Sequence, residues 1–310
     1  MIVELYAKTD VGRIRSGNED NYLVLDLSTS KSWIGTEGSE TPAEMCRFEV
    51  GPEGLVLVVS DGMGGALAGD VASRMAVETV RDMLAGSDDE EEAICAAGTP
   101  LIDCLRNATD YANFAIHRKS QEDPRCSGMG ATLTGAAVTA DGLDLVQVGD
   151  SRGYVIRGGE IKLATKDQSL VQQLVDVGQI SEQEAETHMF RNVILQALGA
   201  QPELASVTGR VRIFQNDHLL LCSDGLSGKL HAEDMRQIVA DAGGDLARAC
   251  DSLVREANRR GGEDNITVVL ARFTGEDLPS PDSNRITVEL PAPTEGDNTI
   301  GRDEDTTENP

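Results

Sequence analysis

Aromatic residues are scarce in this chain of 310 residues, at 3% of the sequence, so aliphatic and small side chains must fill its core. Basic residues are also few, because 27 Lys and Arg face 53 Asp and Glu and leave a net charge of −26. Direct nucleic-acid binding requires a basic surface, and the sequence has no Lys/Arg cluster to supply one. We therefore expect no nucleic-acid partner, and we expect the acidic side chains to serve solubility and the binding of hard cations.

Long apolar stretches and paired cysteines are missing as well. No window approaches the 18 or so apolar residues that a transmembrane helix needs. The first ten residues show no cationic stretch followed by an apolar one, so no signal peptide is predicted. The six cysteines are scattered without a Cys-x-x-Cys pair, which argues against a zinc site and a disulfide framework. These absences predict reduced thiols, no membrane partner and a cytoplasmic location.

A change in composition divides the chain into a folded body, residues 1–274, and a tail, residues 275–310. The tail is rich in Pro and Thr and carries ten acidic against two basic residues. Such a segment buries too little apolar surface to offset its chain entropy, so we predict an acidic disordered tail. Thr299, if phosphorylated, would suit an arginine-rich phosphothreonine reader. The simpler interpretation is a solubilising tail.

The pattern of the body predicts antiparallel sheets covered by helices. Closely spaced runs at 131–139 and 143–148 indicate a hairpin, and the order of elements is not a regular βαβ alternation. Residues 28–54 look like a long polar insertion, and residues 166–199 look like a small lid. Strands are predicted at 23–27, 55–60, 131–139, 143–148, 154–157, 207–213, 219–223 and 266–273. Helices are predicted at 70–84, 101–118, 232–240 and 245–259.

The informative acids lie where the predicted strands end or begin. Asp61 and Asp224 each follow an apolar run within Ser-Asp-Gly, and Asp150 follows a third run. Asp20 and Asp264 each belong to a Glu-Asp-Asn triplet just before a strand. Because one antiparallel strand ends beside the start of the next, the four acids Asp61, Asp224, Asp20 and Asp264 can share one edge. A single Ser-Asp-Gly is usually only a turn, but five such elements together make that interpretation insufficient.

Carboxylates gathered in this way raise one another's pKa and need a neutralising partner. Lys and Arg are rare at these positions, and ligation by oxygen alone favours Mg²⁺ or Mn²⁺ over Zn²⁺. Gly62, Gly64 and Gly65 allow the backbone to approach a metal or phosphate closely, whereas no nucleotide-binding glycine motif is matched. Arg15 is placed to fork onto phosphate oxygens, although a lone arginine is more simply a surface ion pair.

Together, the strand-end acids, the glycines and Arg15, with the short segments around them, resemble the type 2C family of metal-dependent protein serine/threonine phosphatases, and among them the bacterial members. The resemblance covers about residues 1–274 and implies an α+β fold, a four-layer α-β-β-α sandwich of two antiparallel sheets flanked by helices. It also implies two Mn²⁺ or Mg²⁺ ions at one end of the sandwich. The matching segments are 9–21, 60–65, 128–132, 149–152, 223–226 and 263–267, in the family's order.

The resemblance implies a role for each matching residue. Asp61 would bridge the two ions, and the carbonyl of Gly62 would ligate one of them. Asp20, with Glu19 nearby, would act directly or through water molecules. The other ion would be completed by Asp224 and Asp264, the substrate phosphate would be held by Arg15, and the supporting residues would be Asp10, Thr132, Asp150 and Asn265.

Three departures from the family pattern concern the metals and the acid. Met63 replaces the histidine of many eukaryotic members, which removes that candidate general acid. The third-metal aspartate is missing beside Cys126, where Asp123 is the nearest acid, and a further one is replaced by Gly228. A third ion is therefore expected to be weak or absent. Residues 166–199 are similar to the family's flap, in which we interpret His188 as a structural contact rather than a catalytic group.

The function implied is hydrolysis of phosphoserine and phosphothreonine on proteins by a metal-activated water, which would reverse Ser/Thr kinase signalling. The expected partners are phosphorylated proteins, namely Ser/Thr kinases and their substrates. Two alternatives stay open. One is a non-catalytic phosphoprotein-binding module, against which the intact acids argue. The other is a two-metal hydrolase of small phosphate esters, because the acids specify the chemistry and the surface specifies the substrate.

Overall fold

Two antiparallel sheets stack face to face in the computed structural model, which describes residues 1–86 and 98–290. The first sheet contains β1 (Ile2–Asp10), β4 (Arg47–Glu49), β9 (Arg152–Arg157), β10 (Glu160–Leu163), β12 (His218–Cys222) and β13 (Ile266–Thr274). The second contains β2 (Asp20–Asp26), β3 (Lys31–Gly35), β5 (Leu55–Met63), β6 (Gly130–Ala131), β7 (Leu133–Thr139), β8 (Gly142–Val148), β11 (Val207–Val211) and β14 (Val288–Glu289). Among the described strands the orders are β10-β9-β12-β13-β1-β4 and β14-β11-β8-β7-β5-β2-β3, with β6 beside β5.

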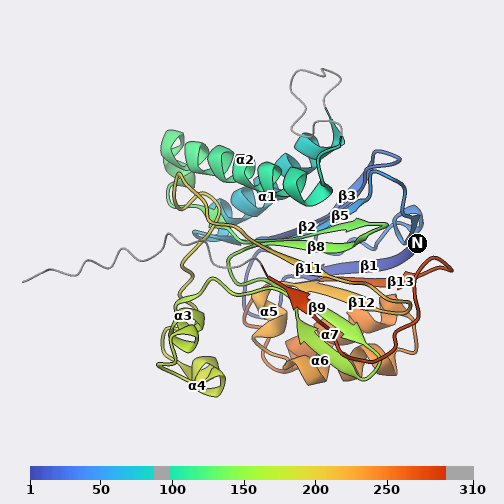
Figure 1. Ribbon diagram of the computed structural model, residues 1–310. Coiled ribbons are helices and arrows are strands. Elements are labelled where there is room, and N and C mark those ends of the chain that lie inside the picture. The colour runs from blue at the N-terminus through green and yellow to red at the C-terminus, as the bar shows by residue number, and fades with distance from the viewer. Residues whose placement is uncertain (87–97, 291–310) are drawn as a thin grey trace, which may run out of the picture.

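Helices cover the outer face of each sheet (Figure 1). α1 (Ala66–Ala85) and α2 (Leu101–Glu122) lie on the second sheet, while α5 (Asp224–Ser227), α6 (Ala232–Asp241) and α7 (Leu246–Arg259) lie on the first. α3 (Leu170–Asp176) and α4 (Glu182–Thr187) stand apart from the sandwich at one end. Two short 3-10 helices, η1 (Ala43–Met45) and η3 (Pro124–Cys126), complete the described elements.

The core has three layers, and strand β5 shows how the sequence builds them. Leu57 and Val59 point between the two sheets, whereas Val56 and Val58 point toward α1 and α2. Side chains alternate between the two faces of a strand, so a strand buried on both faces reads as one continuous apolar run. The third layer packs the first sheet against α6 and α7. The predicted α-β-β-α sandwich is thereby confirmed, as is the β7–β8 hairpin.

The first strand corrects the sequence analysis, which assigned no strand to residues 2–10. β1 lies in the interior of the first sheet and pairs with both β13 and β4. Its inward residues Val3, Leu5 and Ala7 alternate with less buried ones such as Glu4 and Lys8. This alternation leaves no continuous apolar run, which was the signal used for the other strands.

The polar insertion at residues 28–54 links the two sheets along one side. β3 pairs with β2 at the edge of the second sheet, and β4 pairs with β1 at the edge of the first. Between them, the Thr41 hydroxyl accepts from the Ala7 N–H and donates to the Ala7 carbonyl, both at 3.0 Å. Residues 28–54 therefore connect the two sheets and close one side of the sandwich.

Residues 275–290 also correct the sequence analysis, because they pack on the body instead of beginning a disordered tail. β14 pairs with β11, and Ile286 is buried in the layer between the sheets. Arg157 donates to the Arg285 carbonyl at 2.7 Å and forms a two-pronged ion pair with Asp217 at 2.9 and 2.8 Å. Residues 291–310, with Thr299, lie outside the described residues.

The described helices and cysteines test two further expectations. Within residues 1–86 and 98–290, no helix is both long enough and apolar enough to span a membrane. Cys46, Cys126, Cys222 and Cys250 are free thiols, as expected. Cys104 is disulfide-bonded, so the expectation of reduced thiols was wrong at this position.

Candidate active site

The strand ends gather the predicted acids at one end of the sandwich. Asp20 begins β2 and lies directly opposite Asp61 of β5 in the antiparallel register. In the other sheet, Asp224 follows the end of β12 and Asp264 precedes the start of β13, its antiparallel partner. The geometry expected from antiparallel strands therefore brings four of the five strand-end acids to one edge. Asp150 follows β8 and lies close enough to Asp224 to influence it electrostatically.

One serine joins the acids of the two sheets, and one arginine binds an acid of the first sheet. The Ser223 hydroxyl, from the end of β12, donates to Asp20 Oδ2 at 2.7 Å. Arg15 Nη2 donates to Asp264 Oδ2 at 2.8 Å, and the Arg15 side chain remains 46% exposed at the mouth of the site. Ser223 was not among the predicted site residues. Its signal was present, because both Ser-Asp-Gly repeats begin with serine, and Ser60 likewise donates to the Thr132 carbonyl at 2.7 Å.

The predicted supporting residues Thr132 and Asn265 fix the backbone around the acids. The Thr132 hydroxyl accepts from the Asp61 N–H at 3.0 Å, and the Asp61 carbonyl accepts from the Thr132 N–H at 2.8 Å. Asn265 accepts from the Glu19 N–H at 2.8 Å and donates to the carbonyls of Val11 and Gly17 at 2.9 and 3.0 Å. These hydrogen bonds therefore fix the backbone at Asp61 and at Glu19, next to Asp20.

Asp10, the remaining supporting candidate, shapes the loop that leads to Arg15. Its Oδ1 accepts from the Gly12 N–H and from Asn258 Nδ2, each at 2.9 Å. Gly12 has a φ of +81°, and a Cβ there would lie 2.3 Å from the Asp264 carbonyl oxygen. Only glycine fits this conformation and this contact. Asp10 thus acts on the loop and does not join the acid cluster.

A small cradle beside Gly69 brings two further oxygens together. A Cβ on Gly69 would lie 2.4 Å from Glu19 Oε2 and 2.9 Å from the Gly62 carbonyl oxygen. Both oxygens therefore occupy the space that any larger side chain would fill. Glu19 and Gly62 were predicted ligands, but Gly69 was not noticed, because a lone glycine within a helical pattern gives no signal of such an approach.

Burial and mutual repulsion raise the pKa values of the clustered acids. Burial, together with the charges of Asp224 and Asp264, raises the pKa of Asp20 to about 7. Burial and the charge of Asp264 raise the pKa of Asp224 to about 6. Burial and the charge of Asp20 raise the pKa of Asp61 well above its ordinary value. The side chains around the cluster supply too little positive charge to neutralise its carboxylates. A bound cation would supply that charge.

The unsatisfied oxygens of the cluster fit a hard cation. Asp20 Oδ1 and Asp224 Oδ1 are buried without a hydrogen-bond partner among the described residues, and such atoms normally have one. In the described part of the chain, no three potential ligands already surround a single point. Arg15 and Ser223 each donate to one of the carboxylates. The donor set is all oxygen, which suits Mg²⁺ or Mn²⁺.

In the presence of a chelator, we expect the stability of the chain to fall as the pH rises from about 4 to about 7. The ordinary aspartate pKa is 3.8, whereas that of folded Asp20 is about 7, so the folded state keeps protons that the unfolded state has lost. Thermal unfolding in EDTA across this range measures the slope, and Mn²⁺ should flatten it. A melting temperature that rises across the range would contradict the account.

Known proteins are similar to this chain over most of its length. Residues 44–263 match the family model for protein phosphatase 2C. The chain belongs to the protein phosphatase 2C family. It is 34% identical over 263 residues to the serine/threonine phosphatase stp of Listeria welshimeri, which covers 85% of this chain and 93% of that protein.

Solved structures of other 2C phosphatases share the fold. The Mycobacterium tuberculosis serine/threonine phosphatase PstP superposes with a TM-score of 0.70 at 32% identity, covering 89% of this chain and all of that one. The catalytic domain of PstP in complex with two manganese ions gives a TM-score of 0.65 at 31% identity, covering 88% and 99% of the two chains. The bacterial form of the 2C fold, expected from the motifs, is confirmed.

Proposed function

We propose that this chain hydrolyses phosphoserine and phosphothreonine on proteins with a water activated at a binuclear Mg²⁺ or Mn²⁺ site. It would thereby reverse the action of Ser/Thr kinases, which together with their substrates are the proposed partners. One observation carries the proposal: acids from both sheets meet at one end, and Asp20 and Asp224 each present an unpartnered buried oxygen there. The name of the Listeria relative and the two manganese ions of the PstP structure support it.

The cations would be held by oxygen ligands from four separate segments. Asp61 would contribute to both cations, Asp224 and Asp264 would contribute from the first sheet, and Asp20 would contribute from the second. The Glu19 carboxylate and the Gly62 carbonyl share the cradle beside Gly69. When bound, two such ions lower the pKa of a water and stabilise both the attacking and the leaving oxygen of a phosphoryl transfer.

A third cation is still expected to bind weakly or not at all. Asp123, the nearest replacement for the missing aspartate, caps η3 by accepting from the Arg125 N–H at 3.1 Å. Its carboxylate also accepts from the Arg125 and Lys119 side chains, at 3.0 and 2.9 Å. These contacts lower the pKa of Asp123 and already neutralise its charge.

Arg15 is expected to bind the substrate phosphate, so Arg15→Ala should raise KM for a phosphothreonine peptide by about 10- to 100-fold. Its guanidinium is exposed at the mouth of the site and donates to Asp264, from which it can turn to phosphoryl oxygens. Steady-state kinetics in Mn²⁺ measure the change. Arg13→Ala, which removes the neighbouring exposed arginine, is the matched control. Equal KM values for the two variants would remove Arg15 from this role.

The proposed function is tested by phosphate release from phosphoserine, phosphothreonine and phosphotyrosine peptides in Mn²⁺, in Mg²⁺ and in EDTA. We expect release from the first two peptides with either metal, and none in EDTA. Binding of phosphopeptide without release would favour a recognition module. Turnover of p-nitrophenyl phosphate without turnover of any peptide would favour a hydrolase of small phosphate esters.

A further inference from the structure

A polar pocket of about 400 Å³ lies where β1, the loop after it and α7 meet. Its side chains include three cations, Lys8, Arg13 and Arg255, and two acids, Asp10 and Asp251. The chain as a whole has a net charge of −26, so a pocket in which cations outnumber acids runs against the general charge. Such a pocket attracts anions from solution.

Both acids of the pocket already accept from neighbouring donors. Asp10 Oδ1 accepts from the Gly12 N–H and from Asn258 Nδ2, each at 2.9 Å. The Asp251 carboxylate accepts from the Lys8 ammonium, so these two side chains neutralise each other. The positive charge that remains in the pocket belongs to its arginines.

The two arginines of the pocket have no carboxylate partner among the described residues. Arg255, on α7, donates to Ser252 Oγ at 2.9 Å, and Arg13 makes no side-chain hydrogen bond within residues 1–86 and 98–290. Both arginines are exposed. A guanidinium presents a fork of N–H donors that matches the oxygens of a phosphate. The pocket therefore offers two such forks to an anion.

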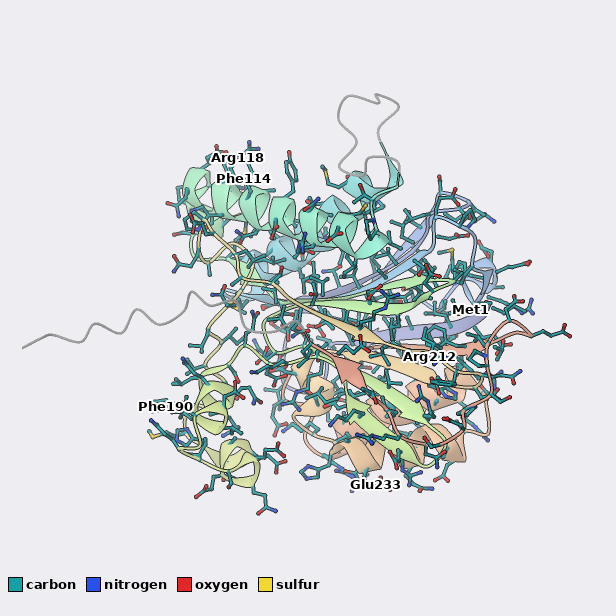
Figure 2. All side chains as sticks on the ribbon, in the orientation of Figure 1. Met1, Phe114, Arg118, Phe190, Arg212 and Glu233 are labelled. Carbon is teal, nitrogen blue, oxygen red and sulfur yellow. The ribbon has the colours of Figure 1, made fainter. Side chains whose placement is uncertain are left out.

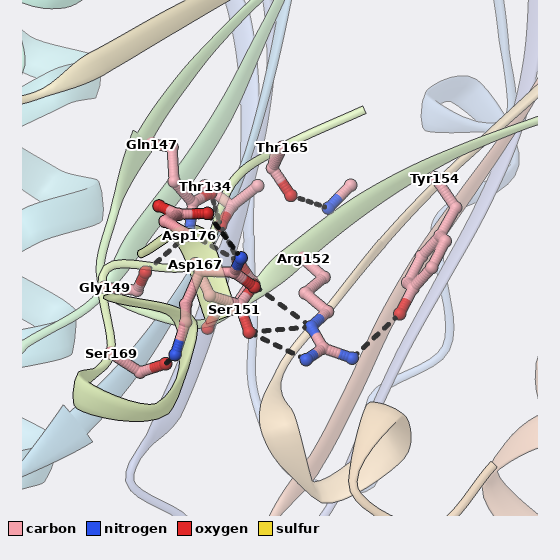
Figure 3. Close-up of polar contacts among 12 residues, drawn as sticks. Thr134, Gln147, Gly149, Ser151, Arg152, Tyr154, Thr165, Asp167, Ser169 and Asp176 are labelled. Atoms are coloured by element: carbon pink, nitrogen blue, oxygen red, sulfur yellow. Dashed lines mark hydrogen bonds and ion pairs between the residues drawn. The ribbon is translucent and has the colours of Figure 1, made fainter. Parts of the chain in front are cut away.

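Most of the other described arginines are matched by an acid, and two of them illustrate the difference. Arg152 donates to both oxygens of Asp167 at 2.7 to 3.1 Å (Figure 3). Arg118, on α2, lies 3.8 Å from Glu122 and over the ring of Phe114 (Figure 2). The two arginines in the pocket lack such a partner and are available for one from outside.

The pocket adjoins the candidate active site through the loop that carries Arg15. Gly12 and Arg13 line the pocket, while Arg15, two residues after Arg13, donates to Asp264 Oδ2 at 2.8 Å. The Arg13 N–H donates to the Gly262 carbonyl at 2.7 Å, which fixes the loop beside Asp264. The Cα atoms of Arg13 and Arg15 are at most about 7.6 Å apart. An extended polypeptide that places a phosphate at Arg15 would therefore bring a residue about two to four positions away to the pocket.

We propose that this pocket is an anion subsite, in which Arg13 and Arg255 bind a second phosphorylated residue of the substrate. That residue lies about two to four positions from the phosphothreonine held at Arg15. The preferred substrates are therefore polypeptides phosphorylated at two neighbouring positions. This inference rests on the proposed function, because it takes a phosphoprotein as the substrate. The subsite binds the second phosphate and takes no part in hydrolysis.

Hydrolysis of matched phosphothreonine peptides tests the proposal. One peptide carries a single phosphothreonine in a neutral sequence. The others also carry a phosphonate analogue of phosphoserine, which cannot be hydrolysed, about two to four positions before or after it. For the native chain in Mn²⁺, we expect KM for the best of these to be about fivefold lower or more than for the single-phosphate peptide. Equal KM values for all the peptides would overturn the proposal.

Arg255→Gln tests whether the pocket causes this preference, defined as the ratio of the two KM values. The ratio should fall below about twofold in Arg255→Gln and in Arg13→Gln, which remove cations from two different elements. The matched control is Arg259→Gln, because Arg259 is 68% exposed on the same helix and lies outside the pocket. A preference that persists in both pocket variants, or that disappears equally in the control, would overturn the subsite. The peptide with one phosphate presents no second anion to the pocket, so the Arg13→Ala control for Arg15 is read on that peptide.

A second readout needs no activity. Fluorescence anisotropy in Mn²⁺ compares labelled peptides that carry one or two phosphonates and no phosphate. The native chain should bind the peptide with two groups about fivefold more tightly or more, whereas Arg255→Gln should bind both peptides within about twofold of each other. Equally tighter binding of the doubly modified peptide by the native chain and by Arg255→Gln would overturn the subsite. A native chain that hydrolyses no peptide would overturn the proposed function, and the anisotropy would then decide the subsite on its own.

Discussion

Asp224→Asn is expected to lower kcat for phosphothreonine-peptide hydrolysis by about 100- to 1,000-fold, the range found when one preorganised electrostatic group is removed. Asp224 lies at the end of β12 beside Asp264, with one oxygen that has no hydrogen-bond partner among the described residues. The amide removes one of the negative charges that would hold the cations, while its size is almost the same. Steady-state kinetics in saturating Mn²⁺ measure the loss.

The same substitution should stabilise the metal-free protein. Burial and the charge of Asp264 raise the pKa of Asp224 to about 6, so at neutral pH its ionised form is unfavourable in the folded state. Asp224→Asn in EDTA should therefore unfold at a higher temperature than the native chain, although it is inactive. Asp241→Asn, at the exposed end of α6, is the control and should change neither property. If Asp224→Asn were inactive and also unfolded at a lower temperature than the native chain in EDTA, the substitution would have damaged the fold as a whole.

Arg157→Ala is expected to cost about 3–5 kcal/mol of unfolding free energy. The side chains of Arg157 and Asp217 are only 5% and 1% exposed, so the substitution leaves a buried carboxylate without its partner. It also removes the donors to the Arg285 and Arg212 carbonyls, at 2.7 and 2.9 Å, and the stacking on Phe214, at 4.2 Å. The segment that leads into β14 should loosen as a result. Equilibrium unfolding in urea measures the cost.

A surface ion pair on the other sheet provides the comparison. Arg210, on β11, lies 3.7 Å from Asp144 and is 52% exposed. Arg210→Ala should therefore cost less than about 1 kcal/mol. Replacing Arg157 and Asp217 together by apolar residues should recover much of the loss, because no buried charge is then left unpaired. A similar small loss for both arginine variants would show that the buried pair does not anchor the C-terminal segment.

Much of the fold was predictable because its strands are buried on both faces. Runs such as 55–60 and 219–223 are continuous and apolar, and the structure places a strand at every predicted position. β1 was missed because its alternation of apolar and polar residues leaves no such run. The segment at 275–290 was missed because its attachment depends on Arg157 and Asp217. These residues are 60 positions apart, and neither carries a local signal.

The acids of the candidate site were predictable for a topological reason. Strand ends in antiparallel sheets are neighbours, so Asp20 could be expected near Asp61 without any knowledge of the fold. The residues that complete the site were not predictable in this way. Ser223 reaches Asp20 across the two sheets, and Gly69 makes room for Glu19 only because α1 packs against the loop before β2. Such contacts follow from tertiary packing and leave no spacing to recognise.

These acids are proposed to form a binuclear metal site at which phosphoproteins are hydrolysed. The most direct test titrates Mn²⁺ into the chelator-treated full chain, counting bound Mn²⁺ by electron paramagnetic resonance and measuring phosphate release in parallel. The account predicts about two ions per chain, with phosphothreonine-peptide hydrolysis appearing as they bind and both lost in Asp224→Asn. A folded chain that hydrolyses the peptide at full rate in EDTA, or that binds no Mn²⁺, would contradict it.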